Sequence, residues 1–293
     1  MNLTNSKIDG RISPIQKGEN MNINENVDNE FIIQQCFLGY QYRKVRKQLY
    51  QVDADIPKKL ICLYYSINEY IDFDIFKEAF IRKYIKEESA LENVHNQIEK
   101  DGMRLMYEYM QTNLEEFSIY SILDYHRMLY SKAEYAEYAG HFRNEDAYIN
   151  GKNTELTPWT MIWSEIRRLN QETNELIKIS QKIKNTKNLD KMFDYINRCI
   201  ELKCKIIRIH PFIDGNGRTM RCFLNKLFEL GGIPPVYIKQ KEKTEYINAM
   251  NKANHDDYKD IIQFYYYKIC DSLVELDINE RLRDEKTKVN IYK

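Results

Sequence analysis

Apolar residues recur along most of this chain at spacings of three and four positions, the periodicity of amphipathic helices. In the first part of the chain this pattern covers residues 31–50, 57–70 and 73–110. Residues 1–28, by contrast, are rich in Asn, Lys and Glu and carry few apolar anchors. We therefore predict a disordered leader over residues 1–28, followed by an N-terminal helical region over residues 29–110.

The same periodicity predicts further helices over residues 118–132, from about Pro158 onward, over 189–210, from Asn216 to the Gly231-Gly232 pair, and around 258–269. Asn150-Gly151 interrupts this series and is a cue for a β-hairpin turn. The sequence thus predicts an all-α fold with one small hairpin. The main helical core would occupy residues 111–276 and a charged tail residues 277–293.

A short loop between two of these helices concentrates residues suited to phosphate chemistry. The apolar run before His210 breaks at Pro211, and a new helical pattern begins near Asn216. Gly215 and Gly217 allow backbone N–H groups to approach an oxyanion without a side chain in the way. The positive end of the following helix adds to the same spot, so the loop predicts an anion site.

The charged side chains of this loop extend that interpretation. Arg218 and Arg221 are three residues apart on the first helical turn, so both face the same way and offer two forks for phosphate oxygens. Asp214 conflicts with a bound anion unless a divalent cation such as Mg²⁺ joins it. His210 is the group of this loop that can accept a proton near neutral pH. The set is typical of a nucleotidyl or phosphoryl transfer site.

Each of these residues also has an ordinary structural role to weigh. His210 could be a hydrogen-bonded core histidine, and Arg218 and Arg221 could be surface residues paired with acids. Asp214 could cap the helix that follows it, a role compatible with metal binding. Their concentration in one glycine-containing loop favours the phosphate site.

The pattern His-x-Phe-x-Asp-Gly-Asn-Gly-Arg-x-x-Arg resembles the signature of the Fic family, with all eight specified positions filled. The resemblance implies a helical fold that transfers AMP from ATP to a protein hydroxyl. It also implies that His210 is the general base, that Asp214 holds Mg²⁺ or Mn²⁺, that Phe212 is a buried anchor, and that Gly215, Asn216, Gly217 and Arg218 cradle phosphates. The second glycine is the form associated with AMP transfer and argues against the kinase-like branch.

Two other stretches agree with the resemblance. Residues 139–158, with Asn150-Gly151 between the two halves, are similar to the family's β-hairpin flap. The resemblance implies that a protein substrate binds along about residues 145–158 by strand pairing. The segment that begins at Lys243 is similar to the one that closes over adenine, which implies that Tyr246 stacks on the base and Asn254 hydrogen-bonds it. The chain has 23 tyrosines, so simple packing is the alternative for Tyr246.

Residues 88–93 resemble the family's inhibitory motif, Ser/Thr-x-x-x-Glu-Gly/Asn. The resemblance implies that Glu92, on an inhibitory helix of about residues 79–100, reaches Arg221 and blocks its grip on the γ-phosphate of ATP. The alternative is a glutamate on a solvated helix face. Glu88 departs from the motif, and two acids at i and i+4 repel by a few tenths of a kcal/mol, so we expect leaky inhibition.

Composition excludes several other classes of function. The 293 residues include 44 Lys and Arg against 44 Asp and Glu, so no basic excess supports nucleic-acid binding. No apolar run approaches the roughly 18 residues of a membrane span, and the N-terminus lacks the hydrophobic stretch of a signal peptide. We expect a cytoplasmic protein without a membrane or nucleic-acid partner.

The expected function is a protein adenylyltransferase that uses ATP to modify a Ser, Thr or Tyr hydroxyl, its own included, under restraint by Glu92. Within enzymes, the alternatives are removal of AMP or transfer of another nucleotide or of phosphocholine. Outside enzymes, the alternative is a module that senses nucleotide and binds a partner. Pairing of protomers into a homodimer stays open.

Overall fold

The computed structural model describes residues 55–67, 73–112, 117–134, 136–147, 156–186 and 188–291. The chain divides into two compact units, Met1–Ile56 and Pro57–Lys293, and nearly all described residues belong to the second. The predicted leader and the helix predicted over residues 31–50 lie outside the described residues.

The described part is helical and contains no strand, which confirms the all-α class. Its elements are α3 (Ile56–Ile67), η1 (Phe73–Phe76), α4 (Lys77–Leu91), α5 (Gln97–Thr112), α6 (Ser121–Tyr130), η2 (Ala136–Tyr138), η3 (Trp159–Met161), α7 (Ile162–Thr186), α8 (Leu189–Ile209), α9 (Asn216–Leu230), η4 (Gln240–Glu242), α10 (Lys243–Ala253) and α11 (Lys259–Ile291). The Asn150-Gly151 turn of the predicted hairpin lies outside the described residues. Within those residues, no helix has both the length and the apolar character needed to cross a membrane.

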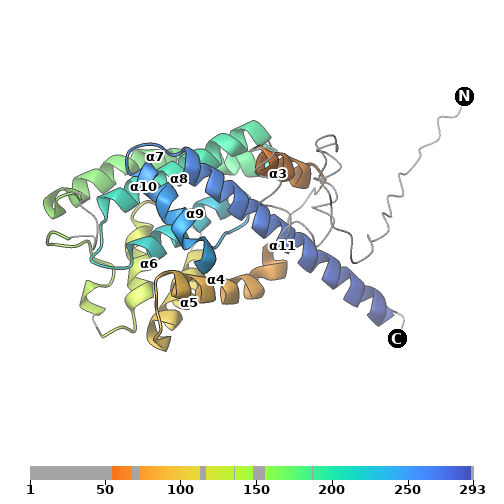
Figure 1. The fold of residues 1–293 in the computed structure, drawn as a ribbon, viewed down its shortest axis with the longest axis horizontal. Helices are drawn as coiled ribbons and strands as arrows, with labels where there is room; N and C mark the ends of the chain where they lie inside the picture. The colour runs from red at the N-terminus through yellow and green to blue at the C-terminus, as the bar shows by residue number, and fades with distance from the viewer. Residues whose placement is uncertain are drawn as a thin grey trace, which may run out of the picture. The chain divides into compact units, whose positions relative to one another are not determined.

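Helix α9 lies at the centre of this unit. It packs against α5, α6, α7 and α8, and Figure 1 shows it among these helices rather than at an edge. Twelve of its fifteen residues are buried, among them polar and charged ones. Buried polar groups usually have partners, and those of Arg218, Arg221 and Asn225 lie on other segments of the chain.

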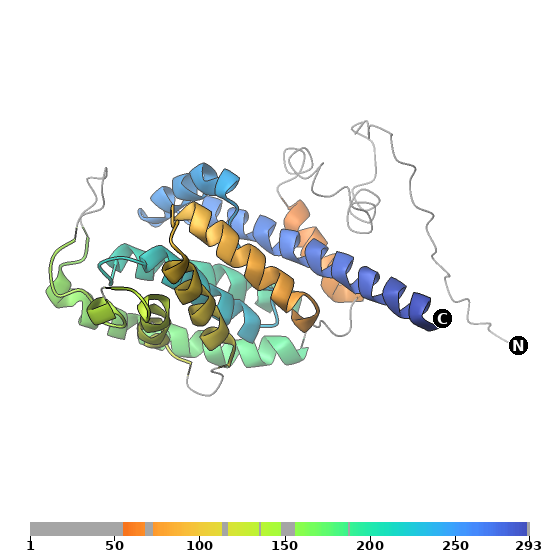
Figure 2. The same ribbon diagram turned by 90° about the horizontal axis from the view of Figure 1, so that it is seen from below.

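The inhibitory helix predicted over about residues 79–100, within the periodic segment 73–110, is in fact two helices. Helix α4 ends at Leu91 and α5 begins at Gln97. Asn93 adopts a left-handed conformation with φ 58°, which ends α4. The Asn96 side chain then accepts a hydrogen bond from the Glu99 N–H at 2.7 Å and starts α5. Figure 2 shows α4 and α5, in orange and yellow, in front of the later helices.

The helices around the predicted loop have the expected bounds. Helix α8 runs to Ile209, and α9 begins at Asn216 and ends before Gly231. Helix α11 starts at Lys259, close to the predicted position, and extends through the predicted charged tail as far as Ile291.

A buried amide ties α9 to the segment that follows it. The Asn225 Nδ2 donates to the Val236 carbonyl at 3.0 Å, and the Val236 N–H donates to Asn225 Oδ1 at 2.8 Å. Both backbone groups of Val236 thus have a partner from one fully buried side chain.

Replacing Asn225 by Ala should lower the free energy of unfolding by about 2–4 kcal/mol, because it leaves two buried backbone groups without partners. Urea unfolding measures the change. Asn248→Ala, at an exposed position of α10, is the control and should stay within about 0.5 kcal/mol of the wild type. Equal stabilities of the two variants would contradict the assigned role of Asn225.

Candidate active site

The loop between α8 and α9 is shaped by two left-handed residues. His210 ends α8 with φ 53°, and its N–H donates to the carbonyls of Ile206 (3.3 Å) and Ile207 (3.1 Å). Gly215, with φ 75°, is the N-cap of α9. A Cβ at Gly215 would lie 2.8 Å from the Tyr130 ring, so this position requires glycine for its conformation and for its space. Asp214 therefore is not the N-cap.

Arg143 holds the carboxyl end of α8. It is buried, and its guanidinium donates to the carbonyls of His210 (2.8 Å), Ile209 (3.5 Å), Glu145 (2.8 Å) and Thr157. Its own N–H donates to the Pro211 carbonyl at 2.9 Å. The Arg143 guanidinium thus pairs with carbonyls that have no partner within α8 at its carboxyl end. It also joins the predicted flap, at Glu145 and Thr157, to the His210 turn.

The core side of the loop is held by His126, Phe212 and Asn216. The His126 ring stacks on Phe212 with centroids 3.9 Å apart, and Phe212 is fully buried, as predicted. His126 Nδ1 accepts from the Gly140 N–H at 2.9 Å, so its Nε2 carries the proton and donates to the Asp214 carbonyl at 3.1 Å. The Asn216 side chain bonds both the N–H and the carbonyl of Phe212. These contacts fix the backbone of the loop.

The His210 side chain is suited to accept a proton. It is half-buried, and its Nδ1 has no hydrogen-bond partner within the described part of the chain. Burial lowers the pKa of His210, and the Arg143 guanidinium lowers it further. The imidazole is therefore neutral at pH 7.

Asp214 and Arg218 form one charged cluster at the start of α9. The Asp214 Oδ2 accepts from Tyr130 OH (2.6 Å) and Arg218 Nη2 (2.9 Å), while Arg218 Nη1 donates to Glu99 Oε2 at 2.7 Å. Burial opposes ionisation of Asp214, but Arg218 and Tyr130 outweigh it and hold its pKa below the usual value. The Asp214 side chain is 68% exposed, so an ionised carboxylate faces solvent.

Arg221 forms a second cluster with two acids at the end of α4. It donates two-pronged hydrogen bonds to Glu88 (2.6–2.9 Å) and a further one to Glu92 Oε1. The predicted meeting of Glu92 and Arg221 is present. From the sequence of this segment alone, Glu88 and Glu92 were expected to repel each other. In the structure, the Arg221 guanidinium lies between the two carboxylates and pairs with both.

The two acids that pair with Arg221 differ in the direction of their pKa shifts. Burial raises the pKa of Glu88, against the effect of Arg221. For Glu92, burial is outweighed by Arg221, with Arg218 and Lys243 contributing, and the pKa is lowered. Lys243 Nζ also donates to the Leu91 carbonyl at 2.5 Å, which places a cation at the carboxyl end of α4.

Tyr246 lies on α10, near Arg221, and Asn254 directly follows this helix. Tyr246 is buried, its ring centroid is 5.9 Å from Arg221 Cζ, and its hydroxyl accepts from Lys203 Nζ at 2.7 Å. The Asn254 carbonyl accepts from Arg208 at 3.3 Å, and its side-chain Oδ1 has no partner in the described part. Their contacts with adenine stay predictions.

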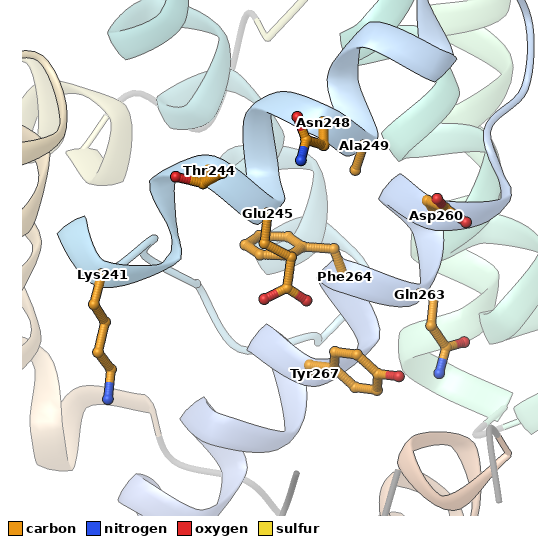
Figure 3. A pocket seen from close by; sticks show the side chains of 9 residues that line it. All are labelled: Lys241, Thr244, Glu245, Asn248, Ala249, Asp260, Gln263, Phe264 and Tyr267. Carbon is orange, nitrogen blue, oxygen red and sulfur yellow. The ribbon is translucent and has the colours of Figure 1, made fainter. Parts of the chain in front are cut away.

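A groove of about 560 Å³ lies between α10 and α11, away from these clusters. Glu245 and Tyr267 point into it, as Figure 3 shows. None of the predicted site residues lines it. Its position on another face of α10 separates it from the anion site.

Most of the predicted residues come together at the amino end of α9, which brings a neutral imidazole, an exposed carboxylate and two guanidiniums to the same helix terminus. Residues 116–228 match the profile described as the Fic/DOC family. This part of the chain is therefore similar to the domains of the Fic/DOC family. Its signature residues, from His210 to Arg221, fall within the matched range.

Curated proteins with similar sequences agree with this match. The chain is 29% identical over 173 residues to the Protein adenylyltransferase Fic of Drosophila erecta, covering 58% of the chain and 32% of the relative. The protein of the same name from Drosophila ananassae is 30% identical to the chain, and the match covers 58% of the chain and 31% of the relative. The chain thus spans about a third of the length of the curated relatives it matches.

Solved structures support the fold of the Fic/DOC domain and its surroundings. Fic-1 of C. elegans (residues 134–508) superposes with a TM-score of 0.63 at 18% identity, covering 87% of this chain and 83% of that one. A Fic domain containing signaling protein from Bacteroides thetaiotaomicron gives 0.58 at 14% identity, covering 77% and 97%.

Several contacts of the Fic site were not predicted from the sequence. Tyr130 and Glu99 bind Arg218, His126 supports the loop, and Glu88 binds Arg221. The sequence offered a signal for one of these contacts, since Glu88 is an acid at a position where the inhibitory motif has Ser or Thr. The others come from distant segments without a motif of their own.

The buried His126 should make the stability of the protein pH-dependent. Burial lowers its pKa to about 4 from 6.5, so the folded state binds the proton more weakly than the unfolded state. Its contribution, about 3 kcal/mol at 1.4 kcal/mol per tenfold change in proton affinity, is fully present above pH 6.5 and lost as the pH falls towards 4.

Unfolding free energies of wild type and His126→Asn between pH 4 and 7 test this prediction. The variant should show a flatter dependence, with a smaller gain from pH 4 to pH 7. His255→Asn, at an exposed position, controls for the loss of one imidazole. Parallel curves for wild type and His126→Asn would rule out the assigned state of His126.

Proposed function

We propose that this protein is a protein adenylyltransferase that transfers AMP from ATP to a Ser, Thr or Tyr hydroxyl of a protein, itself included. The observation that carries the proposal is the convergence of His210, Asp214, Arg218 and Arg221 at the amino end of α9. The names of the curated relatives support the same activity.

In the proposed reaction, His210 accepts the proton of the attacking hydroxyl. Because its Nδ1 is buried, Nε2 is the nitrogen that an incoming hydroxyl meets. The hydroxyl oxygen attacks the α-phosphorus, a new O–P bond forms, and the bond to the β-phosphate oxygen breaks to release pyrophosphate. The lowered pKa of His210 keeps the base neutral at working pH.

The chain's own groups would stabilise the charge on the departing pyrophosphate. The first N–H groups of α9 have no partner within the helix. Gly217 has no side chain to cover them, and the group that now lies beside it is the Glu92 carboxylate. Arg218 lies beside these N–H groups, and Arg221 would meet the γ-phosphate once Glu92 leaves. Such preset donors act without rearrangement during the reaction.

Asp214 is the residue that would hold Mg²⁺ or Mn²⁺. Its carboxylate is ionised and largely exposed, and no group of three or more potential ligands occurs among the described residues. One carboxylate together with substrate phosphates and waters is a common arrangement for Mg²⁺. When bound, the metal would neutralise charge on the phosphate oxygens.

We further propose that the Glu92–Arg221 pair restrains the enzyme, because Glu92 occupies the guanidinium that would otherwise bind phosphate.

A protein target would lie along residues 145–158. The described ends of that segment, Glu145 and Thr157, are tied to the His210 turn by Arg143. A bound target segment would therefore be aligned with the base.

His210→Ala should lower AMP incorporation at least about 100-fold, the usual effect of losing a general base, while ATP binding is retained. Intact-mass spectrometry and labelling with α-phosphate-labelled ATP measure the transfer. His141→Ala, at an exposed histidine near the same loop, is the control and should keep its activity. Undiminished labelling by the His210→Ala protein would instead favour a nucleotide-sensing module.

Glu92→Gly should raise AMP incorporation about 10- to 100-fold, since a charge-assisted hydrogen bond from Arg221 to phosphate is worth roughly 1.5–3 kcal/mol. Self-labelling and labelling of lysate proteins, with each nucleotide as donor, measure the effect and the donor preference. Glu78→Gly, exposed at the other end of α4, is the matched control. Unchanged labelling after Glu92→Gly would remove the inhibitory role.

A further inference from the structure

Glu88 and Glu92 bind the same guanidinium in different ways. The Glu88 side chain is 1% exposed and accepts three hydrogen bonds, two from Arg221 Nε (2.8 and 2.9 Å) and one from Nη2 (2.6 Å). The Glu92 side chain is 34% exposed and accepts one, from Nη2. Glu88 is therefore a buried, two-pronged partner and Glu92 a single partner at the surface.

The two acids also occupy different edges of Arg221. Glu88 covers the edge formed by Nε and Nη2. The opposite end faces the start of α9, since a Cβ at Gly217 would lie 2.8 Å from both Arg221 Nη1 and Glu92 Oε1. An anion that arrives beside Gly217 meets Nη1 and Nη2. It has to displace Glu92, whereas Glu88 can stay in place.

We propose that Glu88 is a positioning residue that holds Arg221 with its Nη groups towards the anion site, so that the γ-phosphate replaces Glu92 alone. This inference rests on the proposed function. In effect Glu88 is a permanent support, and Glu92 is the exchangeable ligand.

The physical reason lies in the buried position of Arg221, which is 5% exposed. A guanidinium carries five N–H donors, and leaving the buried Nε–H without an acceptor costs free energy. A long side chain without such a support also loses rotamer freedom when phosphate binds. Glu88 removes both costs before ATP arrives. Its negative charge, by contrast, weakens the attraction of Arg221 for any anion, so the direction of the effect on ATP binding decides between support and competition.

The test uses the full chain in the Glu92→Gly background, with and without Glu88→Gln. The glutamine keeps the shape of the side chain but removes the charge and one acceptor. We expect Kd and KM for ATP to rise about tenfold, with kcat within about threefold. ADP has no γ-phosphate for Arg221 to bind, so its Kd should change less than about twofold. Calorimetry measures both affinities.

Glu88→Asp and Glu78→Gln complete the set of variants. Aspartate keeps the charge on a shorter side chain and should recover part of the ATP affinity. Glu78→Gln, exposed on the same helix, should change neither affinity. If Glu88→Gln proves unfolded by circular dichroism, the ATP-to-ADP affinity ratio of Glu88→Asp gives the answer, and an unchanged ratio overturns the proposal.

Two further outcomes would also overturn it. Tighter ATP binding by Glu88→Gln would show that Glu88 competes with phosphate, and equal losses for ATP and ADP would show general damage to the site. Failure of the proposed function is distinct. No variant would then transfer AMP, whereas the ATP-to-ADP affinity ratio would still report the role of Glu88.

Discussion

The turn at His210 is the constraint on which the rest of the site depends. A non-glycine residue in the left-handed region is uncommon, and it persists here because Arg143 holds the neighbouring carbonyls while Asn216 and His126 hold the loop from the core side. The turn ends α8, carries the half-buried His210 imidazole and leads the chain into α9. The proposed base and the proposed anion site thus belong to one backbone segment.

The second organising feature is charge pairing around a buried helix. Arg218 and Arg221 lie inside the protein, where an unpaired charge is costly, and helices α4 and α5 supply the carboxylates that pair them. The N-terminal helical layer therefore supplies part of the proposed active site. Under the proposed function, a phosphate that enters the site exchanges one anionic partner for another, so the arginines are held in place before it arrives.

The sequence predicted the loop, the bounds of α8 and α9 and the meeting of Glu92 with Arg221, because these follow from local periodicity and a dense motif. It did not predict the break at Asn93, which depends on a single left-handed residue within an otherwise periodic segment. Nor did it predict the role of Glu88. From its own segment, the Glu88 carboxylate would only be expected to repel Glu92. Its role depends on the Arg221 guanidinium, 133 residues away in the sequence. Local patterns carry no information on such pairings.

The Arg143 guanidinium binds the carbonyls of Glu145 and Thr157, so both ends of the segment between them are held in place. Once the two ends of a segment are fixed, lengthening it costs little entropy, about 0.6 kcal/mol per doubling. The segment between these two residues therefore tolerates changes in length without displacement of the His210 turn. Under the proposed function, target preference would vary there while His210 stays in place.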